Sequence, residues 1–330
     1  MSKQVFVTRR IPREGLDLLE EGGVEFEVFG GDRPIGREEL LEGVRDKDGL
    51  LCLLTDRVDR DVMEAAPGLR VISLYAVGYD KVDLREATRR GILVTNTPGV
   101  LTDATADLAW ALLFAAARRV VEADRFFRSG KWNGWGPLQF LGADITGRTL
   151  GVVGAGRIGA NFAKKAKGFE MKVLYVHPRR KAELEEELGA RRVSLEELLR
   201  ESDFVSLHVP LTEETRGMIG AAELSLMKPG AVLVNTSRGP VVDERALVAA
   251  LREGRPAAAG LDVYENEPLP APGLTDLPNL VCLPHIGSAT VGTRTRMARM
   301  AARNLLDGLE GRIPPNLVNP EALEGRRGKA

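Results

Sequence analysis

Three polar segments stand directly after apolar runs in the second half of the chain, and each holds a side chain suited to acid–base or anion-binding chemistry. Arg238 lies in VNTSRG, Glu267 in LDVYENEP and His285 in PHIGSAT. The apolar runs predict strands of one parallel sheet, and ligands bind at the carboxyl edge of such sheets. We therefore expect these three side chains to meet at one site.

The three side-chain types suit the reduction of a carbonyl group that neighbours a carboxylate. Imidazoles ordinarily titrate near neutrality, so His285 can give a proton to the carbonyl oxygen. Glu267 can hold that imidazole in one orientation and favour its protonated form. Arg238 offers paired N–H donors that can bind the carboxylate and polarise the carbonyl. A nicotinamide cofactor would supply the hydride to the carbonyl carbon.

Residues 154–159, GAGRIG, follow an apolar run and precede a helical pattern. In a strand–turn–helix context, the GxGxxG spacing is typical of dinucleotide binding. Gly154 allows the tight turn, Gly156 lets the backbone approach a pyrophosphate, and Gly159 lets helix and strand pack closely. The amino end of the following helix presents free N–H groups to the phosphates. The segment predicts a pyrophosphate site for NAD(H) or NADP(H).

The next strand pattern indicates which dinucleotide is preferred. In NAD-binding chains, an acidic residue about 20 positions after the first glycine binds the ribose 2′-hydroxyl. Here His177 occupies the corresponding position, and Arg179 and Arg180 follow it. Paired guanidinium donors suit a 2′-phosphate, so we predict that NADP(H) is preferred and NAD(H) is possible. The alternative interpretation is a solvated basic turn ahead of a helix.

The elements that must position these residues alternate between strand and helix patterns. The segment 102–128 contains neither Gly nor Pro and is predicted as one long helix. Six strand patterns begin at Thr149, a number that matches the dinucleotide-binding fold. Further strand patterns fall at 5–8, 24–29, 49–54 and 71–74, and further helical patterns at 11–21, 37–44, 62–66, 160–167 and 289–309.

These patterns predict an α/β protein with two Rossmann-like domains. Residues 99–287 would form a dinucleotide-binding domain, inserted into a flavodoxin-like substrate domain. That second domain would be discontinuous and built from both chain ends, 1–98 and 288–330. A length of 330 residues is comfortable for two domains.

Composition argues against several classes of protein. The 46 basic and 47 acidic residues nearly cancel, so nucleic acid is not an expected partner. No run of roughly 18 apolar residues occurs, so no membrane span is expected. Cys52 and Cys282 lie in apolar runs and are expected to be buried, reduced thiols of a cytoplasmic protein. Scattered histidines and two cysteines predict no metal site.

Taken in order, these motifs resemble the D-2-hydroxyacid dehydrogenase family, which includes glyoxylate and hydroxypyruvate reductases. The resemblance covers almost the whole chain, and the segments SLYAVGYD, HVPLT and MKPGA add to the motifs above. It implies NAD(P)H-dependent reduction of glyoxylate or hydroxypyruvate to the D-2-hydroxy acid. Arg238 would bind the substrate, and His285 would be the acid/base that Glu267 orients. The segments IPPNLVNP and LLTD favour these substrates within the family.

The resemblance also implies individual contacts. Leu53 would line the substrate pocket, and the backbone N–H groups of Val77 and Gly78 would bind the substrate carboxylate, with Arg238 and His285. The implied cofactor contacts are Thr105, Gly154, Gly156, Arg157, Ile158, Gly159, His177, Arg179, Arg180, Val209, Pro210, Thr215, Thr236, Asp262 and Gly287.

Three of the polar residues have simpler interpretations as well. Asp262 would lie near the nicotinamide carboxamide, or it could only cap the end of a strand. Thr105 would face the cofactor, or it could be an ordinary threonine on a helix surface. His208 is expected to be structural and not catalytic, although its side chain could do acid–base chemistry.

The segment from Thr102 through the loop KWNGWGPLQ resembles the dimerisation arm of the family. Its apolar and aromatic composition suits an interface, so a homodimer through residues 100–140 is expected. Gln139 and its neighbours would then reach the active site of the partner. Trp132 and Trp135 could instead be core anchors.

The same motifs are compatible with other activities of related proteins. Phosphoglycerate dehydrogenase is the main rival enzyme, but many such chains carry a further regulatory domain, for which 330 residues leave no room. Formate dehydrogenases of this superfamily have glutamine where this chain has Glu267, which argues against that activity. A dinucleotide-sensing corepressor could keep Arg238, Glu267 and His285, and only turnover would distinguish it from an enzyme.

Overall fold

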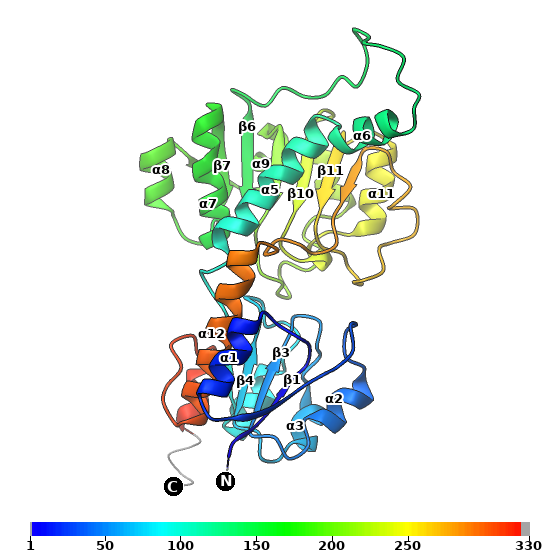
Figure 1. The fold of residues 1–330 in the computed structure, drawn as a ribbon. Coiled ribbons are helices and arrows are strands. Elements are labelled where there is room, and N and C mark those ends of the chain that lie inside the picture. The colour runs from blue at the N-terminus through cyan, green and yellow to red at the C-terminus, as the bar shows by residue number, and fades with distance from the viewer. Residues whose placement is uncertain (1, 325–330) are drawn as a thin grey trace. The chain divides into compact units, whose positions relative to one another are not determined.

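A computed structural model describes residues 2–324 of the chain. The chain separates into two compact units. The first unit comprises Met1–Leu101 and Ala289–Ala330, and the second unit comprises Thr102–Ser288. Each unit contains a parallel sheet accompanied by helices, which confirms the predicted α/β class (Figure 1).

The sheet of the first unit has five parallel strands in the order β2-β1-β3-β4-β5. This is the flavodoxin-like order that the sequence predicted. The sequence patterns missed β5, because a strand of three residues is too short to show a periodicity. The strands are β1 (Gln4–Val7), β2 (Glu25–Val28), β3 (Gly49–Cys52), β4 (Val71–Leu74) and β5 (Leu93–Thr95).

Both ends of the chain build the first unit. The Ser73 hydroxyl on β4 donates a hydrogen bond of 2.8 Å to the Ala301 carbonyl on α12, and the Asn319 side chain accepts one of 2.8 Å from the Val94 N–H on β5. Segments more than 200 residues apart therefore share one set of buried contacts. The helices are α1 (Arg13–Glu21), α2 (Arg37–Gly43), α3 (Arg60–Ala65), α4 (Leu84–Arg90), α12 (Val291–Leu309) and the 3-10 turn η3 (Pro320–Leu323).

The sheet of the second unit has seven parallel strands in the order β12-β11-β10-β9-β6-β7-β8. Six of them match the predicted six, but the count of six is wrong. Strand β8 was missed because its two residues are exposed arginines with no apolar signal. The strands are β6 (Thr149–Val153), β7 (Lys172–Val176), β8 (Arg191–Arg192), β9 (Phe204–Leu207), β10 (Val232–Asn235), β11 (Ala258–Leu261) and β12 (Leu280–Cys282).

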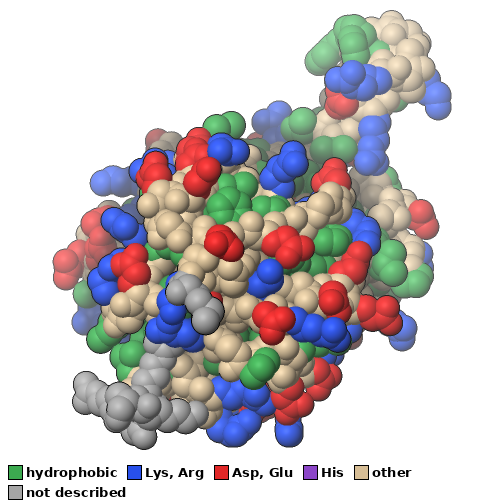
Figure 2. Space-filling view, turned by 60° about the horizontal axis from the view of Figure 1, so that its bottom comes forward, with side chains coloured by type: hydrophobic (Ala, Val, Ile, Leu, Met, Phe, Trp, Pro, Cys, Tyr) green, Lys and Arg blue, Asp and Glu red, His purple; other side chains and the backbone are tan. Residues whose placement is uncertain are grey.

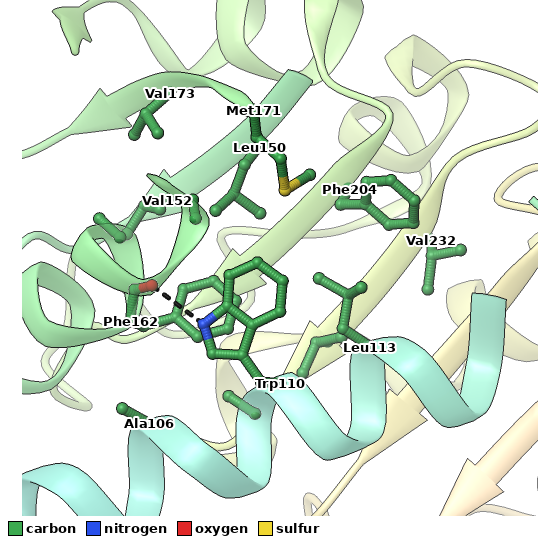
Figure 3. Close-up of a cluster of buried hydrophobic side chains, with 14 of the residues drawn as sticks. Ala106, Trp110, Leu113, Leu150, Val152, Phe162, Met171, Val173, Phe204 and Val232 are labelled. Carbon is green, nitrogen blue, oxygen red and sulfur yellow. Dashed lines mark hydrogen bonds between the residues drawn. The ribbon is translucent and has the colours of Figure 1, made fainter. Parts of the chain in front are cut away.

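Helix α5 is the central helix of the second unit and packs on its sheet. Its Trp110 stacks on Phe162 with ring centroids 4.8 Å apart, and the indole N–H donates to the Phe162 carbonyl at 3.0 Å. Figure 3 shows this pair within a cluster of buried apolar side chains. The helices are α5 (Thr102–Ala117), α6 (Val120–Arg128), α7 (Arg157–Lys165), α8 (Ala182–Leu188), α9 (Leu195–Glu201), α10 (Ala221–Leu226) and α11 (Glu244–Arg252), with 3-10 turns η1 (Ala166–Phe169) and η2 (Gly239–Val241).

The prediction of one helix over 102–128 is wrong, because α5 ends at Ala117 and α6 begins at Val120. Arg119 between them has a left-handed backbone with φ of 54°. The chain returns at Ala143, whose N–H donates to the Ala117 carbonyl at 2.9 Å and so satisfies the end of α5. Helix α5 buries eight residues, whereas α6 buries none. The break therefore comes from a tertiary contact and not from a helix-breaking residue.

The surface carries both signs of charge. Figure 2 shows Lys and Arg interspersed with Asp and Glu over the face drawn there. Within residues 2–324, no helix is both long and apolar enough to cross a bilayer. The same residues hold no cluster of three or more His, Cys, Asp or Glu side chains that could bind a metal ion.

The two cysteines differ in environment. Cys52 is buried in β3, as expected, but the prediction that Cys282 is buried is wrong. Cys282 is the last residue of β12, which is an edge strand of its sheet, so its side chain is exposed. The apolar run around it does not reveal that the strand lies at an edge.

Candidate active site

Apart from Thr105 on α5, the candidate site residues of the second unit follow six different strands of one parallel sheet. All of these strands point the same way, so the residues after their carboxyl ends share one edge. The first strand of the unit, β6, lies between β7 and β9, so the strand order reverses at the β6–β9 pair. This is the topological switch point, where open α/β sheets bind ligands.

His285 and Glu267 form a direct pair at this edge. The imidazole Nδ1 lies 2.9 Å from the Glu267 carboxylate, and both side chains are partly exposed. An ionised carboxylate can only accept, so Nδ1 carries the proton in this bond. The other ring nitrogen, Nε2, is then available to a ligand.

Several groups keep Glu267 ionised. Burial alone would raise the pKa of Glu267, but the hydrogen bond and positive charge of His285, the Tyr264 N–H and the Arg238 charge together lower this pKa. The Tyr264 N–H donates to the second carboxylate oxygen at 3.1 Å. A carboxylate held in this state stabilises a protonated imidazole beside it.

Arg238 is presented by a short turn after β10. The side chain of the buried Asn235 donates to the Arg238 carbonyl at 2.9 Å and accepts from the Ser237 N–H at 3.0 Å. A Cβ on the next residue, Gly239, would lie 1.8 Å from the carbonyl carbon of Tyr264. The Arg238 turn and the Glu267 loop are therefore in van der Waals contact, and only glycine fits between them.

Asp262 holds the loop that carries His285. Its two carboxylate oxygens accept from the Ile286 N–H at 2.7 Å and the Gly287 N–H at 2.8 Å. Burial raises the pKa of Asp262, although these N–H groups and the charge of His285 oppose the change. Thr105 is buried on α5, and its hydroxyl donates to the Gly287 carbonyl at 3.2 Å. Thr105 is therefore not an ordinary surface threonine.

Two further residues, which were not predicted as site residues, hold this site together. Asn235 fixes the Arg238 turn, and a polar residue at the end of an apolar strand was the available signal. Tyr264 joins two strand ends, because its hydroxyl donates to the Leu283 carbonyl at 2.9 Å while its N–H bonds Glu267. No periodicity in the sequence marks Tyr264, since this role depends on the pairing of β11 with β12.

The turn at residues 154–159 fits the pyrophosphate of a dinucleotide. Gly154 has φ of 96°, and a Cβ on Gly159 would lie 2.0 Å from the Gly154 carbonyl oxygen. A Cβ on Gly156 would meet nothing within 4 Å, so the backbone is open on that side. No side chain caps the amino end of α7, which begins at Arg157, so its first N–H groups can serve an anion. Ile158 lies in the same first turn.

The residues expected around the cofactor ribose follow β7. Burial and the charges of Lys181, Arg179 and Arg192 lower the pKa of His177, which indicates a positive local potential. Arg192 donates to the His177 carbonyl at 3.0 Å and so braces this turn. Arg180 is mostly exposed and pairs with Glu185 at 2.6 Å. Arg179 is exposed, with no hydrogen bond or ion pair to another residue in the range 2–324.

The loop after β9 contains Val209 and Pro210. The Thr215 hydroxyl donates to the Pro210 carbonyl at 2.6 Å and accepts from the Thr212 N–H at 2.8 Å, which closes the loop. His208 precedes these residues, and its Nε2 lies 2.9 Å from the Ser206 hydroxyl oxygen. Burial lowers the pKa of His208 to about 3, so this imidazole stays neutral and is unsuited to donating a proton near neutral pH.

Thr236 is the remaining predicted cofactor contact, directly after β10. It is buried, and its hydroxyl finds no partner within residues 2–324. A buried hydroxyl without a partner is costly, so an open hydrogen bond here fits a bound polar ligand.

Leu53, Val77 and Gly78 belong to the first unit. Leu53 follows β3 and Val77 follows β4, and these strands are neighbours in the sheet. The Leu53 N–H donates to the buried Asp56 carboxylate at 2.7 Å, and the Val77 carbonyl accepts from the Asn96 side chain at 2.8 Å. Both loops are thus fixed at the carboxyl edge of the first sheet.

Comparison with known proteins agrees with this geometry. Residues 110–287 match the model of the D-isomer specific 2-hydroxyacid dehydrogenase NAD-binding domain. A glyoxylate reductase from Thermococcus litoralis is 57% identical over 98% of both chains. A crystal structure of a glyoxylate reductase from Paecilomyes thermophila has 36% identity and a TM-score of 0.85, covering 97% of this chain and 99% of that one.

A third relative was solved with a cofactor. The NADPH-dependent glyoxylate/hydroxypyruvate reductase from Sinorhizobium meliloti, in complex with NADP and malonate, has 33% identity and a TM-score of 0.85 over 98% of each chain. The family model and these full-length likenesses agree with the resemblance seen in the motifs. The chain therefore belongs to the D-isomer specific 2-hydroxyacid dehydrogenase family and is an NAD(P)-dependent dehydrogenase.

Proposed function

We propose that this enzyme reduces glyoxylate to glycolate and hydroxypyruvate to D-glycerate. The observation that carries the proposal is the His285–Glu267 pair, at 2.9 Å, beside the Arg238 turn at the carboxyl edge of the dinucleotide-binding sheet. Relatives that are 53–57% identical over nearly the full chain carry the name glyoxylate reductase, which supports the choice of substrate.

Arg238, His285 and Glu267 each have a separate role in the proposed reduction. The Arg238 guanidinium binds the substrate carboxylate with paired N–H donors and polarises the keto oxygen. His285 gives its Nε2 proton to that oxygen, because its Nδ1 is occupied by Glu267. Glu267 stabilises the protonated imidazole before the transfer and keeps its orientation. A bound nicotinamide dinucleotide supplies the hydride for the carbonyl carbon.

Residues of the first unit complete the proposed substrate contacts. Val77 and Gly78 would offer backbone N–H groups to the substrate carboxylate, and Leu53 would lie against the substrate's small side chain. Support comes from the fixed loops after β3 and β4, which hold these residues in place. The domain assignment is part of the same proposal: 1–98 with 288–330 is the substrate domain, and 99–287 is the dinucleotide domain.

An absorbance assay at the reduced-nicotinamide band tests this function. We expect purified protein to consume the reduced cofactor with glyoxylate and with hydroxypyruvate, and to act poorly on 3-phosphohydroxypyruvate. Preference for the phosphorylated acid would point to phosphoglycerate dehydrogenase instead. Dinucleotide binding without consumption, over a panel of 2-keto acids, would contradict the proposal and favour a sensor.

We propose as cofactor contacts the residues named for this role in the sequence, among them Thr105, the 154–159 turn, Thr236 and Gly287. For Asp262, both carboxylate oxygens already bond the His285 loop, so a contact with the carboxamide would use a remaining lone pair. The positive potential at His177 supports a preference for NADP(H), with NAD(H) still accepted, and so does Arg179, which has no ion-pair partner within residues 2–324.

Replacing Arg179 with serine is expected to raise KM for NADPH by about 10-fold and to leave KM for NADH unchanged. The lost contact is a charge-assisted hydrogen bond to the 2′-phosphate, worth about 1.5 kcal/mol at the low end for such bonds. Arg180→Ser should have a smaller effect, because Arg180 is already paired with Glu185. Steady-state kinetics with both cofactors measures the ratio.

Arg148→Ser is the matched control, since Arg148 pairs with Asp144 just before the amino end of β6. An equal change in both cofactors for Arg179→Ser would contradict the preference. It would instead support the interpretation of 179–180 as a solvated basic turn.

We also propose a homodimer formed through the 100–140 arm. After α6 the chain forms an extended loop before β6 (Figure 1). In this loop, Trp135 is 83% exposed and Leu138 is 81% exposed. Large apolar side chains exposed together suit an interface. A cytoplasmic location stays part of this proposal and is supported by two cysteines that form no disulfide with each other.

The double variant Trp135→Ser/Leu138→Ser is expected to shift the protein from dimer to monomer. Burying each large apolar side chain contributes about 1.5–3 kcal/mol, and a homodimer loses four of them, so the dimer Kd should rise by about 10⁴-fold or more. Sedimentation velocity over a concentration series measures this. Ile313→Ser, an exposed apolar site outside the arm, should leave the sedimentation coefficient unchanged.

If Gln139 reaches the partner's site, Gln139→Ala should raise the substrate KM.

A further inference from the structure

Glu244 is a buried carboxylate with no role in the mechanism above. It is the first residue of α11 and is only 2% exposed. Its two oxygens accept hydrogen bonds from the Glu265 N–H at 2.6 Å and from the Ala271 N–H at 2.7 Å. Carboxylates are rarely buried unless such partners are present, so this one is tied to the loop it bonds.

The loop that Glu244 holds is the one that carries Glu267. Residues 265 and 271 flank Glu267 on both sides, so a single carboxylate clamps the two arms of the loop. The Glu267 carboxylate, which lies between the two clamped residues, accepts from the Tyr264 N–H at one oxygen and bonds His285 at the other. The position of the Glu267 carboxylate therefore depends on a loop whose ends are fixed from α11.

The same helix follows the turn that carries Arg238. Arg238, η2 (Gly239–Val241) and Glu244 lie within seven consecutive residues, and Gly239 packs directly on the Tyr264 carbonyl. Glu244 thus joins the segment that presents Arg238 to the segment that presents Glu267. These two segments come from different strands, β10 and β11.

We propose that Glu244 is a positioning residue for reduction, acting through the 265–271 loop to hold Glu267 against His285. This inference rests on the proposed roles of Glu267 and His285. It does not require Glu244 to touch the substrate or cofactor. A displacement of about 1 Å in a catalytic group can cost about 10²-fold in rate, so a clamp of this kind has a measurable effect.

The test compares Glu244→Gln and Glu244→Ala with the wild-type enzyme. Glutamine keeps one acceptor and turns its NH2 toward an N–H donor, so one of the two bonds is lost. Alanine loses both bonds. We expect kcat to fall by about 10-fold for glutamine and about 100-fold for alanine. The Kd for the dinucleotide should stay within about 2-fold, because the 154–159 turn lies after another strand, β6.

Asp243→Ala is the matched control for a purely structural effect. Asp243 caps the same helix by accepting from the Ala246 N–H at 2.9 Å, but it has no contact with the 265–271 loop among the bonds described. It should lower the melting temperature as Glu244→Ala does, because losing an N-cap costs about 1 kcal/mol. It should leave kcat unchanged.

The isotope effect with a 4-deuterated reduced nicotinamide separates misplacement from partial unfolding. Misplacement slows the chemical step, so the effect on kcat should rise in Glu244→Ala. A merely unfolded fraction lowers the apparent kcat without changing the isotope effect. Wild-type kcat and an unchanged isotope effect in folded Glu244→Ala would overturn the inference. Absence of turnover in the wild-type enzyme would instead reject the proposed function.

Discussion

Replacing His285 with asparagine is expected to lower kcat by about 10²- to 10⁴-fold, the usual contribution of a positioned general acid. Asparagine can still bond Glu267 in place of Nδ1, but it has no titrating nitrogen to pass a proton to the keto oxygen. The Kd for the dinucleotide should stay within about 2-fold, because the 154–159 turn follows β6, whereas His285 follows β12. Single-turnover kinetics and cofactor fluorescence titration measure the two quantities.

A double-mutant cycle with Glu267→Gln sharpens this expectation. Glutamine keeps the shape of the side chain but removes the charge that favours the protonated imidazole, so Glu267→Gln alone should also lower kcat. The double variant should be little worse than His285→Asn, because Glu267 acts through the imidazole it bonds at 2.9 Å. Fully additive losses would show that Glu267 acts independently of His285 and would reject the proposed division of roles.

Replacing Arg238 with glutamine is expected to lower kcat/KM by about 10²- to 10⁴-fold. Two charge-assisted hydrogen bonds to the substrate would be lost, each worth about 1.5–3 kcal/mol. Arg238→Lys should recover part of the loss, since an ammonium keeps the charge but not the planar fork. Steady-state kinetics over a wide range of glyoxylate concentration resolves the contributions of kcat and KM.

Arg238 has a second effect that the same variants reveal. Its charge helps to lower the pKa of Glu267, so its loss should raise that pKa and weaken turnover first at the acidic end of the pH range. Arg255→Gln is the control. Arg255 lies just before the amino end of β11, whereas the site residues follow the carboxyl ends of the strands, and its side chain donates to the Ser225 carbonyl. A loss in Arg238→Gln no greater than in this control would contradict the role given to Arg238.

The residue types of the site could be predicted from the sequence because their chemistry is local. A GxGxxG turn needs glycine for the reasons the backbone shows at Gly154 and Gly159, and both requirements act within a few residues. The approximate position of most strands was also accessible, because strands buried on both faces form continuous apolar runs. The two arginines of β8 have no such signal, and this strand was missed.

Residues that act across the sheet could not be predicted in the same way. Tyr264 holds the site through the Leu283 carbonyl on a neighbouring strand end, 19 positions away in the chain. Glu244 bonds residues that are 21 and 27 positions away. In sequence it is one acidic residue at the start of a helix, where helices commonly carry acidic side chains in any case.

Local patterns were enough to predict the fold class and to mark Arg238, Glu267 and His285 as candidate site residues after successive strand patterns. Periodicity and turn chemistry are local properties, and a parallel sheet brings the carboxyl ends of its strands to one edge whatever else the chain does. Three features could not be predicted from these patterns: the break in the 102–128 helix, the exposure of Cys282 and the hydrogen bonds from the Glu267 loop to Glu244. Each of these depends on contacts between segments far apart in the chain, such as the Ala143 N–H that ends α5 at Ala117.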